Sequence, residues 1–87
     1  MDALIDVSMH PLSDDFTPQI DTFIYKVQNH PDLEVAVSDT STTIRGPYDT
    51  VMSVVTKAMK ESLNSVPCTF NLRVLGGQTA NVENKHR

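Results

Sequence analysis

The sequence is poor in the residues that would suggest cross-links, a thiolate metal centre or a nucleic-acid surface. It has one cysteine, Cys68, no tryptophan, and seven lysines and arginines against eleven aspartates and glutamates, for a formal charge of −4. A single cysteine excludes an internal disulfide and a paired-thiolate metal site, and it favours a reducing compartment, so we expect a cytoplasmic protein. Scattered cations on an acidic chain also disfavour nucleic-acid binding, which needs a basic stripe.

Long apolar runs are missing as well. No stretch approaches the roughly 20 apolar residues that span a bilayer, so we expect no membrane segment. The start of the sequence also lacks a basic region followed by an apolar run, which disfavours a signal peptide. With 87 residues, the chain suits one domain, which we expect over residues 1–80, with a polar tail over 81–87. A domain of this size has a modest core, so self-association is expected.

Hydrophobic periodicity divides the domain into six elements. Apolar and polar residues alternate over residues 3–10, 33–37 and 68–75, which predicts strands, and the threonine-rich residues 41–46 suit another. Apolar side chains recur at helical spacing over residues 16–27 and 51–59, with Asp49 as a candidate N-cap of the second helix. The order predicts an α+β, ferredoxin-like β-α-β-β-α-β sandwich, with two helices on one face of a four-stranded antiparallel sheet.

Strand alternation also predicts which side chains lie beneath the helices. The expected set is apolar and comprises Ile5, Val7, Val35, Val37, Ile44, Phe70, Leu72 and Val74. The opposite face has mixed polarity, which suits either solvent or contact with a second sheet.

No set of catalytic residues is apparent. His10 ends the first strand, His30 lies in a turn and His86 in the tail, and nothing in the pattern brings them together. No nucleophile has a recognisable base partner, so we expect a protein without enzymatic activity. Asp14 and Asp15 are adjacent carboxylates, but that position suits the start of a helix.

The unusual segment is Asp-Thr-Ser-Thr-Thr over residues 39–43, at a predicted hairpin. Strand parity directs Asp39 and Thr42 toward the edge of the layer between sheet and helices. Buried polar groups need partners, which a small ligand would supply. In the alternative, the hydroxyls bond to the backbone of the turn. His10 likewise is either a polar strand end or a ligand contact.

Three dispersed motifs carry a resemblance to a known family. They are SMHPLSD at residues 8–14, STTIRG at 41–46 followed by YD at 48–49 and VM at 51–52, and FNL at 70–72 with GG at 76–77. Together they resemble the YkoF-like family of thiamine- and hydroxymethylpyrimidine-binding proteins, over roughly residues 3–80. His10 stands where that family often has a tyrosine.

The resemblance implies a domain that binds a thiamine-type ligand without turning it over, needs no other cofactor, and associates as a homodimer or homotetramer. An aminopyrimidine offers an amine to a carboxylate, and ring nitrogens to hydroxyl and amide groups. We therefore expect the ligand-binding residues to be Asp39, Ser41, Thr42, Thr43, Ser8, His10 and Asn71, with apolar walls from Phe16, Tyr48 and Met52. Parity places Ser8 and Asn71 on the other sheet face, so the face that carries the site stays open.

Two other functions stay open at this point. A structural or regulatory module would self-associate through strand edges or sheet faces, with the Ser/Thr segment inside the interface. An enzyme would require an acid, base or nucleophile that the sequence does not display.

Overall fold

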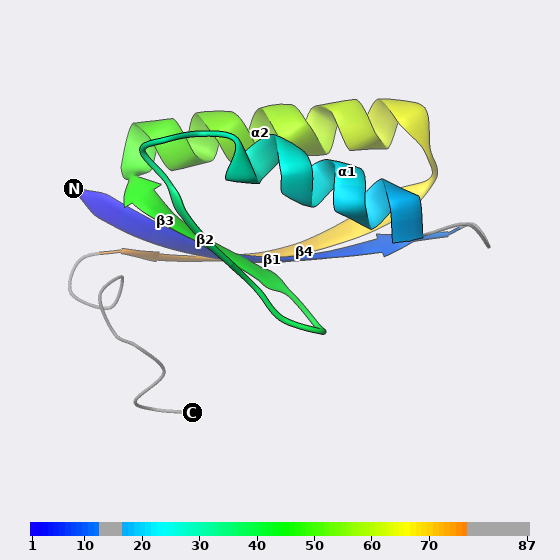
Figure 1. Ribbon diagram of the computed structural model, residues 1–87, viewed down its shortest axis with the longest axis horizontal. Helices are drawn as coiled ribbons and strands as arrows, with labels where there is room; N and C mark the ends of the chain where they lie inside the picture. Colours follow the sequence, from blue (N-terminus) through cyan, green and yellow to red (C-terminus); the bar gives the residue numbers. More distant parts are fainter. Residues whose placement is uncertain (13–16, 77–87) are drawn as a thin grey trace.

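The computed structural model describes residues 1–12 and 17–76, and the expected elements occur there in the expected order. The elements are β1 (Asp2–Pro11), α1 (Thr17–Gln28), β2 (Glu34–Val37), β3 (Thr42–Pro47), α2 (Tyr48–Ser65) and β4 (Cys68–Gly76). The strands form one antiparallel sheet in the order β2-β3-β1-β4. Both helices lie over one face of it (Figure 1). The predicted ferredoxin-like sandwich is confirmed, while the expected tail over 81–87 lies outside the described residues.

Strand register decides which side chains the helices cover. Ile5 of β1 lies between Ile44 of β3 and Val74 of β4. Because side chains alternate along each strand, the set predicted to lie beneath the helices shares one face. Coverage is uneven, since Ile5 and Ile44 are fully buried whereas Val37 is 50% and Val74 48% exposed. The exposed members belong to β2 and β4, which are the two edges of the sheet.

The core lies between the sheet and one stripe on each helix. The buried apolar residues of the helices are Phe23 and Val27 from α1, and Val51, Val55 and Ala58 from α2. The ring of Phe23 contacts that of Phe70 in β4, with centroids 5.2 Å apart and planes tilted by 48°. Tilted pairs at this distance are favourable, so the contact helps to hold α1 against the sheet. Within the described residues, neither helix is long and apolar enough to cross a membrane.

The second helix begins two residues earlier than its expected cap, Asp49, implies. Pro47 occupies the N-cap position without a side-chain hydrogen bond from the described residues, and Asp49 lies in the first turn. The backbone N–H of Tyr48 instead donates to the carbonyl of Met1, at 2.9 Å. Asp49 still favours the positive end of the helix dipole, but it is not the cap. The expected start of the first helix at residues 13–15 lies outside the described residues.

Candidate functional site

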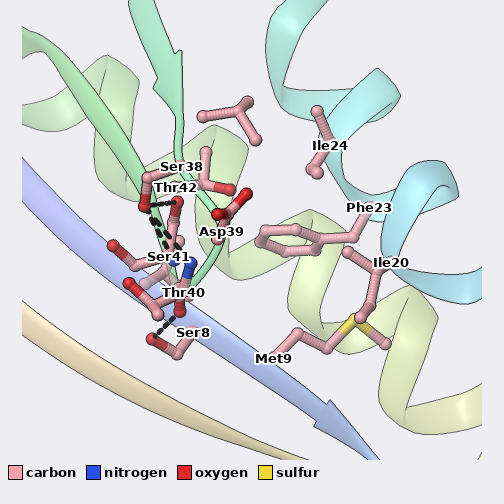
Figure 2. A pocket seen from close by; sticks show the side chains of 12 residues that line it. Ser8, Met9, Ile20, Phe23, Ile24, Ser38, Asp39, Thr40, Ser41 and Thr42 are labelled. Carbon is pink, nitrogen blue, oxygen red and sulfur yellow. Dashed lines mark hydrogen bonds between the residues drawn. The ribbon is translucent and has the colours of Figure 1, made fainter. Parts of the chain in front are cut away.

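A small pocket opens where the β2–β3 hairpin meets α1, at the edge of the layer between sheet and helices (Figure 2). Its volume is about 80 Å³. We call it the hairpin pocket. It is lined by Val7, Ser8 and Met9 of β1, by Ile20, Phe23 and Ile24 of α1, and by Val37, Ser38, Asp39, Thr40, Ser41 and Thr42 of the hairpin and its strands. One wall is therefore mostly apolar and the other mostly polar.

The two walls differ in exposure as well as in polarity. Phe23 is 2% exposed and belongs to the core, whereas Asp39 is exposed. In Figure 2 the side chain of Asp39 projects from the hairpin toward Phe23. A carboxylate in this position can accept hydrogen bonds from a ligand whose ring rests on the apolar wall.

The hairpin owes its shape to Ser38. The Oγ of Ser38 donates to the carbonyl of Ser41 at 3.1 Å and accepts from the backbone N–H groups of Thr40 and Ser41, at 3.3 and 3.2 Å. The Oγ of Ser8 donates to the carbonyl of Thr40 at 3.0 Å and so fastens the turn to β1. Ser38 and Ser8 lie outside residues 39–43, for which hydroxyl bonds to the backbone were the alternative; within that segment, Thr43 Oγ1 donates to the carbonyl of Ala36 at 3.4 Å. Asp39 is held at the tip of a turn that its neighbours stabilise.

Four of the expected site residues line the hairpin pocket: Ser8, Asp39, Ser41 and Thr42. Thr42 is 6% exposed and lies opposite Val7, on the helix side as parity predicts. Parity directs Ser8 to the other face, yet Ser8 borders the pocket, because the β1–β3 pairing ends at Val7 and Thr42. Beyond that point the turn passes beside β1.

The other three expected residues lie elsewhere. Thr43 lines a hollow on the opposite side of the sheet, together with Ser41. Asn71 is exposed and pairs with Ser8 across the β1–β4 ladder, and His10 is exposed two residues further along β1. The hairpin pocket thus brings the hairpin residues and Ser8 together, whereas Thr43, Asn71 and His10 do not line it.

The apolar wall differs from the expected one. Neither Tyr48 nor Met52 lines the hairpin pocket, and Phe16 lies outside the described residues. Instead the wall consists of Met9, Ile20, Phe23 and Ile24. The last three belong to the apolar stripe that predicts the first helix, so the signal was present, but a stripe does not reveal which of its members reach a pocket.

Metal-binding side chains do not gather in the described part of the chain. Nowhere in residues 1–12 and 17–76 do three or more His, Cys, Asp or Glu side chains lie close enough to hold an ion.

Comparisons with known proteins relate the chain to others by fold. No protein-family model and no curated protein matches it. Among solved structures, the protein SP2199 of Streptococcus pneumoniae has a TM-score of 0.85 at 20% identity, over 98% of this chain and 97% of that one. A proposed thiamine biosynthesis/salvage protein of Thermotoga maritima has a TM-score of 0.79 at 16% identity, over 91% and 87%. A domain of unknown function, DUF77, from Bacillus cereus has a TM-score of 0.77 at 18% identity, over 99% and 88%. At these identities the likeness shows the fold alone.

Proposed function

We propose that this protein binds thiamine or a related pyrimidine, such as hydroxymethylpyrimidine, in the hairpin pocket and does not turn it over. The observation that carries the proposal is the combination of an exposed carboxylate, Asp39, with the apolar wall around Phe23 in one small pocket. The motifs at residues 8–14 and 41–46 add support, as does the fold shared with the Thermotoga maritima protein.

In the proposed complex, each polar group of an aminopyrimidine has a partner in the pocket. The exocyclic amine of the ligand donates to the Asp39 carboxylate, and the hydroxyls of Ser41 and Thr42 bond to ring nitrogens. The flat ring rests against Ile20 and Ile24, which are partly exposed beside the buried Phe23, as ligand rings usually do in pockets that are mostly apolar with a few converging polar groups.

Pocket size determines which part of the ligand enters. The volume of about 80 Å³ is well below that of pockets that enclose a whole drug-sized molecule, which begin at roughly 300 Å³. We therefore propose that only the pyrimidine ring enters and that the thiazolium of thiamine extends past Asp39 into solvent. The formal charge of −4 favours this cation slightly. Hydroxymethylpyrimidine should then bind through the same residues as thiamine.

We also propose that the protein works as a homodimer or homotetramer in the cytoplasm. The single cysteine supports the location. The nine-residue strand β4 supports self-association, because it is an edge of the sheet and carries Leu72 and Val74 at 36% and 48% exposure. Edge strands offer unpaired backbone groups to a second chain. The same features favour an interaction module as the second candidate function, which predicts an oligomer that binds neither ligand.

Calorimetric titration with thiamine, and separately with hydroxymethylpyrimidine, tests the proposal. We expect saturable binding in the micromolar range, about −8 kcal/mol. Asp39→Asn should weaken it about tenfold or more, because hydrogen bonds to charged groups contribute about 1.5–3 kcal/mol. The matched control Asp49→Asn removes the same charge from the first turn of α2 and should bind as the parent does. Thr42→Val should weaken binding while the melting temperature is kept.

Light scattering on the same samples shows whether the protein is a folded oligomer, and the heat of binding then separates the two candidate functions. A folded oligomer that gives no heat with either ligand would reject the binder and favour the interaction module. Parent-like affinity in Asp39→Asn would remove Asp39 from the site even if the protein binds.

A further inference from the structure

A second hollow lies on the sheet face that the helices leave open. Its volume is about 300 Å³. Its floor is one row across the sheet, in which Ala36 pairs with Thr43, Thr43 with Asp6, and Asp6 with Arg73. Ser41 of the hairpin borders one side. We call this hollow the open-face pocket. Unlike the hairpin pocket, it reaches the lower range of volumes that hold whole small molecules.

The floor of the open-face pocket holds a carboxylate with an unused oxygen. Asp6 Oδ2 accepts a hydrogen bond from Arg73 Nη2 at 3.3 Å. Asp6 Oδ1 is buried and has no hydrogen-bond partner among residues 1–12 and 17–76. Buried polar atoms are almost always paired, and an unpaired charged oxygen is especially unfavourable. Asp6 is therefore poised for a donor that the described residues do not supply.

Arg73 covers this carboxylate only loosely. Its side chain is 70% exposed and makes one contact with Asp6, at 3.3 Å. A tight pair exists on the same sheet face, where Arg45 Nη2 donates to both oxygens of Glu34 at 2.7 and 2.8 Å. Exposed, long ion pairs stabilise little, so Arg73 can swing into solvent at small cost and release Oδ2 of Asp6, whose side chain is 24% exposed.

The remaining polar group on the floor is also an acceptor. Thr43 Oγ1 makes a long hydrogen bond to the carbonyl of Ala36, at 3.4 Å, and its lone pairs can accept from a group in the pocket. With Arg73 displaced, Asp6 and Thr43 together present acceptors and a negative charge. A ligand that suits them carries a positive charge and several N–H groups.

We propose that the open-face pocket binds a small organic cation of the amidinium or guanidinium class. Its two parallel N–H groups donate to Oδ1 and Oδ2 of Asp6, which is the two-bond geometry that planar cations form with carboxylates. Thr43 Oγ1 accepts a further N–H, and Arg73 is displaced by the incoming cation. This site goes beyond the proposed function, because it lies on the other sheet face and uses neither Asp39 nor Thr42.

Benzamidine is the probe, and benzamide, with the same shape and no charge, is its control. Both are titrated into the isotopically labelled full chain, and backbone amide signals are followed by NMR. We expect saturable shifts at Asp6, Thr43 and Arg73 with benzamidine and none with benzamide, within about 10 mM, a range in which weak sites are still detected. Shifts centred on Asp39 and Thr42 would place the probe in the hairpin pocket and overturn the proposal.

Two variants with opposite expectations complete the test. Asp6→Asn should weaken benzamidine binding about tenfold or more, whereas the control Asp21→Asn, an exposed change on α1, should not affect it. Arg73→Gln removes the competing cation and should bind benzamidine as tightly as the parent or more tightly. If Asp6→Asn fails to fold, the comparisons with Arg73→Gln and with benzamide still test whether the open-face pocket binds the cation.

Three further outcomes would overturn the proposal. They are the absence of saturation, parent-like binding in Asp6→Asn, and weakened binding in Arg73→Gln. A failure of thiamine to bind would not bear on this result, because binding in the two pockets shifts the backbone amide signals of different residues.

Discussion

Replacing Gly46 by alanine should destabilise the protein through one contact that the structure defines. Gly46 is buried in β3, opposite Ala3 of β1. A Cβ added there would lie 2.5 Å from Leu33 Cδ2 and 3.1 Å from the carbonyl oxygen of Asp32. Carbon atoms in contact prefer about 3.5–4.0 Å, so Leu33 Cδ2 must move by about 1 Å. Leu33 is only 9% exposed, and its neighbours in the core restrict that movement.

The size of the effect follows from two opposing terms. Overpacking a core usually costs about 1–3 kcal/mol. Replacing glycine at a compatible backbone position stabilises by about 0.4–1 kcal/mol, because it restricts the unfolded chain. We expect a net loss of about 1–2 kcal/mol in the free energy of unfolding. In a domain of this size each kcal/mol shifts the melting temperature by about 4–8 °C, so the variant should melt about 5–15 °C lower.

Thermal unfolding followed by circular dichroism measures this loss, and Gly76→Ala is the matched control. A Cβ at Gly76 meets no atom of the described residues within 4 Å. Gly76→Ala should therefore melt at the temperature of the parent or slightly above. If Gly46→Ala had the same melting temperature as Gly76→Ala, Leu33 would have repacked freely, and the account of this contact would be wrong.

Two further predictions concern ion pairs. Glu34→Gln should lower the free energy of unfolding, measured by urea denaturation, by less than about 1 kcal/mol. The reason is that the Glu34 side chain is 73% exposed, although it accepts two hydrogen bonds from Arg45. A loss of several kcal/mol would contradict this prediction. The hydrogen bond and positive charge of Lys26, 3.0 Å away, lower the pKa of Glu61, with a smaller contribution from Lys57. The stabilisation from this pair should therefore be present at neutral pH and be lost as pH falls through the lowered pKa. In an NMR titration, Lys26→Met should raise the Glu61 pKa toward its ordinary value, and an unchanged pKa would refute this cause.

The fold was predictable because its signals are local and agree with one another. Alternation over 3–10, 33–37 and 68–75 and the two helical stripes each identify an element within a short window, and their order allows few topologies. The helix α2 begins two residues before the position that a cap at Asp49 implies, and the N–H of Tyr48 donates to the carbonyl of Met1. A hydrogen bond between residues so far apart in the chain leaves no local signal.

The candidate site was predictable only where its residues are neighbours in the chain. Asp39, Ser41 and Thr42 belong to one run of small polar residues, which drew attention to all three, and strand parity directed Asp39 and Thr42 toward the pocket. The apolar wall comes from α1, and its stripe was visible, but which end of the helix lies against the hairpin depends on packing. The sequence therefore indicated one wall of the hairpin pocket and not the other.

By itself, the sequence determined the elements, their order, the covered face of the sheet and the polar hairpin, because side-chain periodicity is a property of consecutive residues. The tertiary structure decided how distant strands align. Ser8 reaches the hairpin pocket because the β1–β3 pairing ends at Val7, and Asp6 meets Arg73 because β1 and β4 pair in that register. Register is settled by burying one face of the whole sheet at once, and no single segment carries that information.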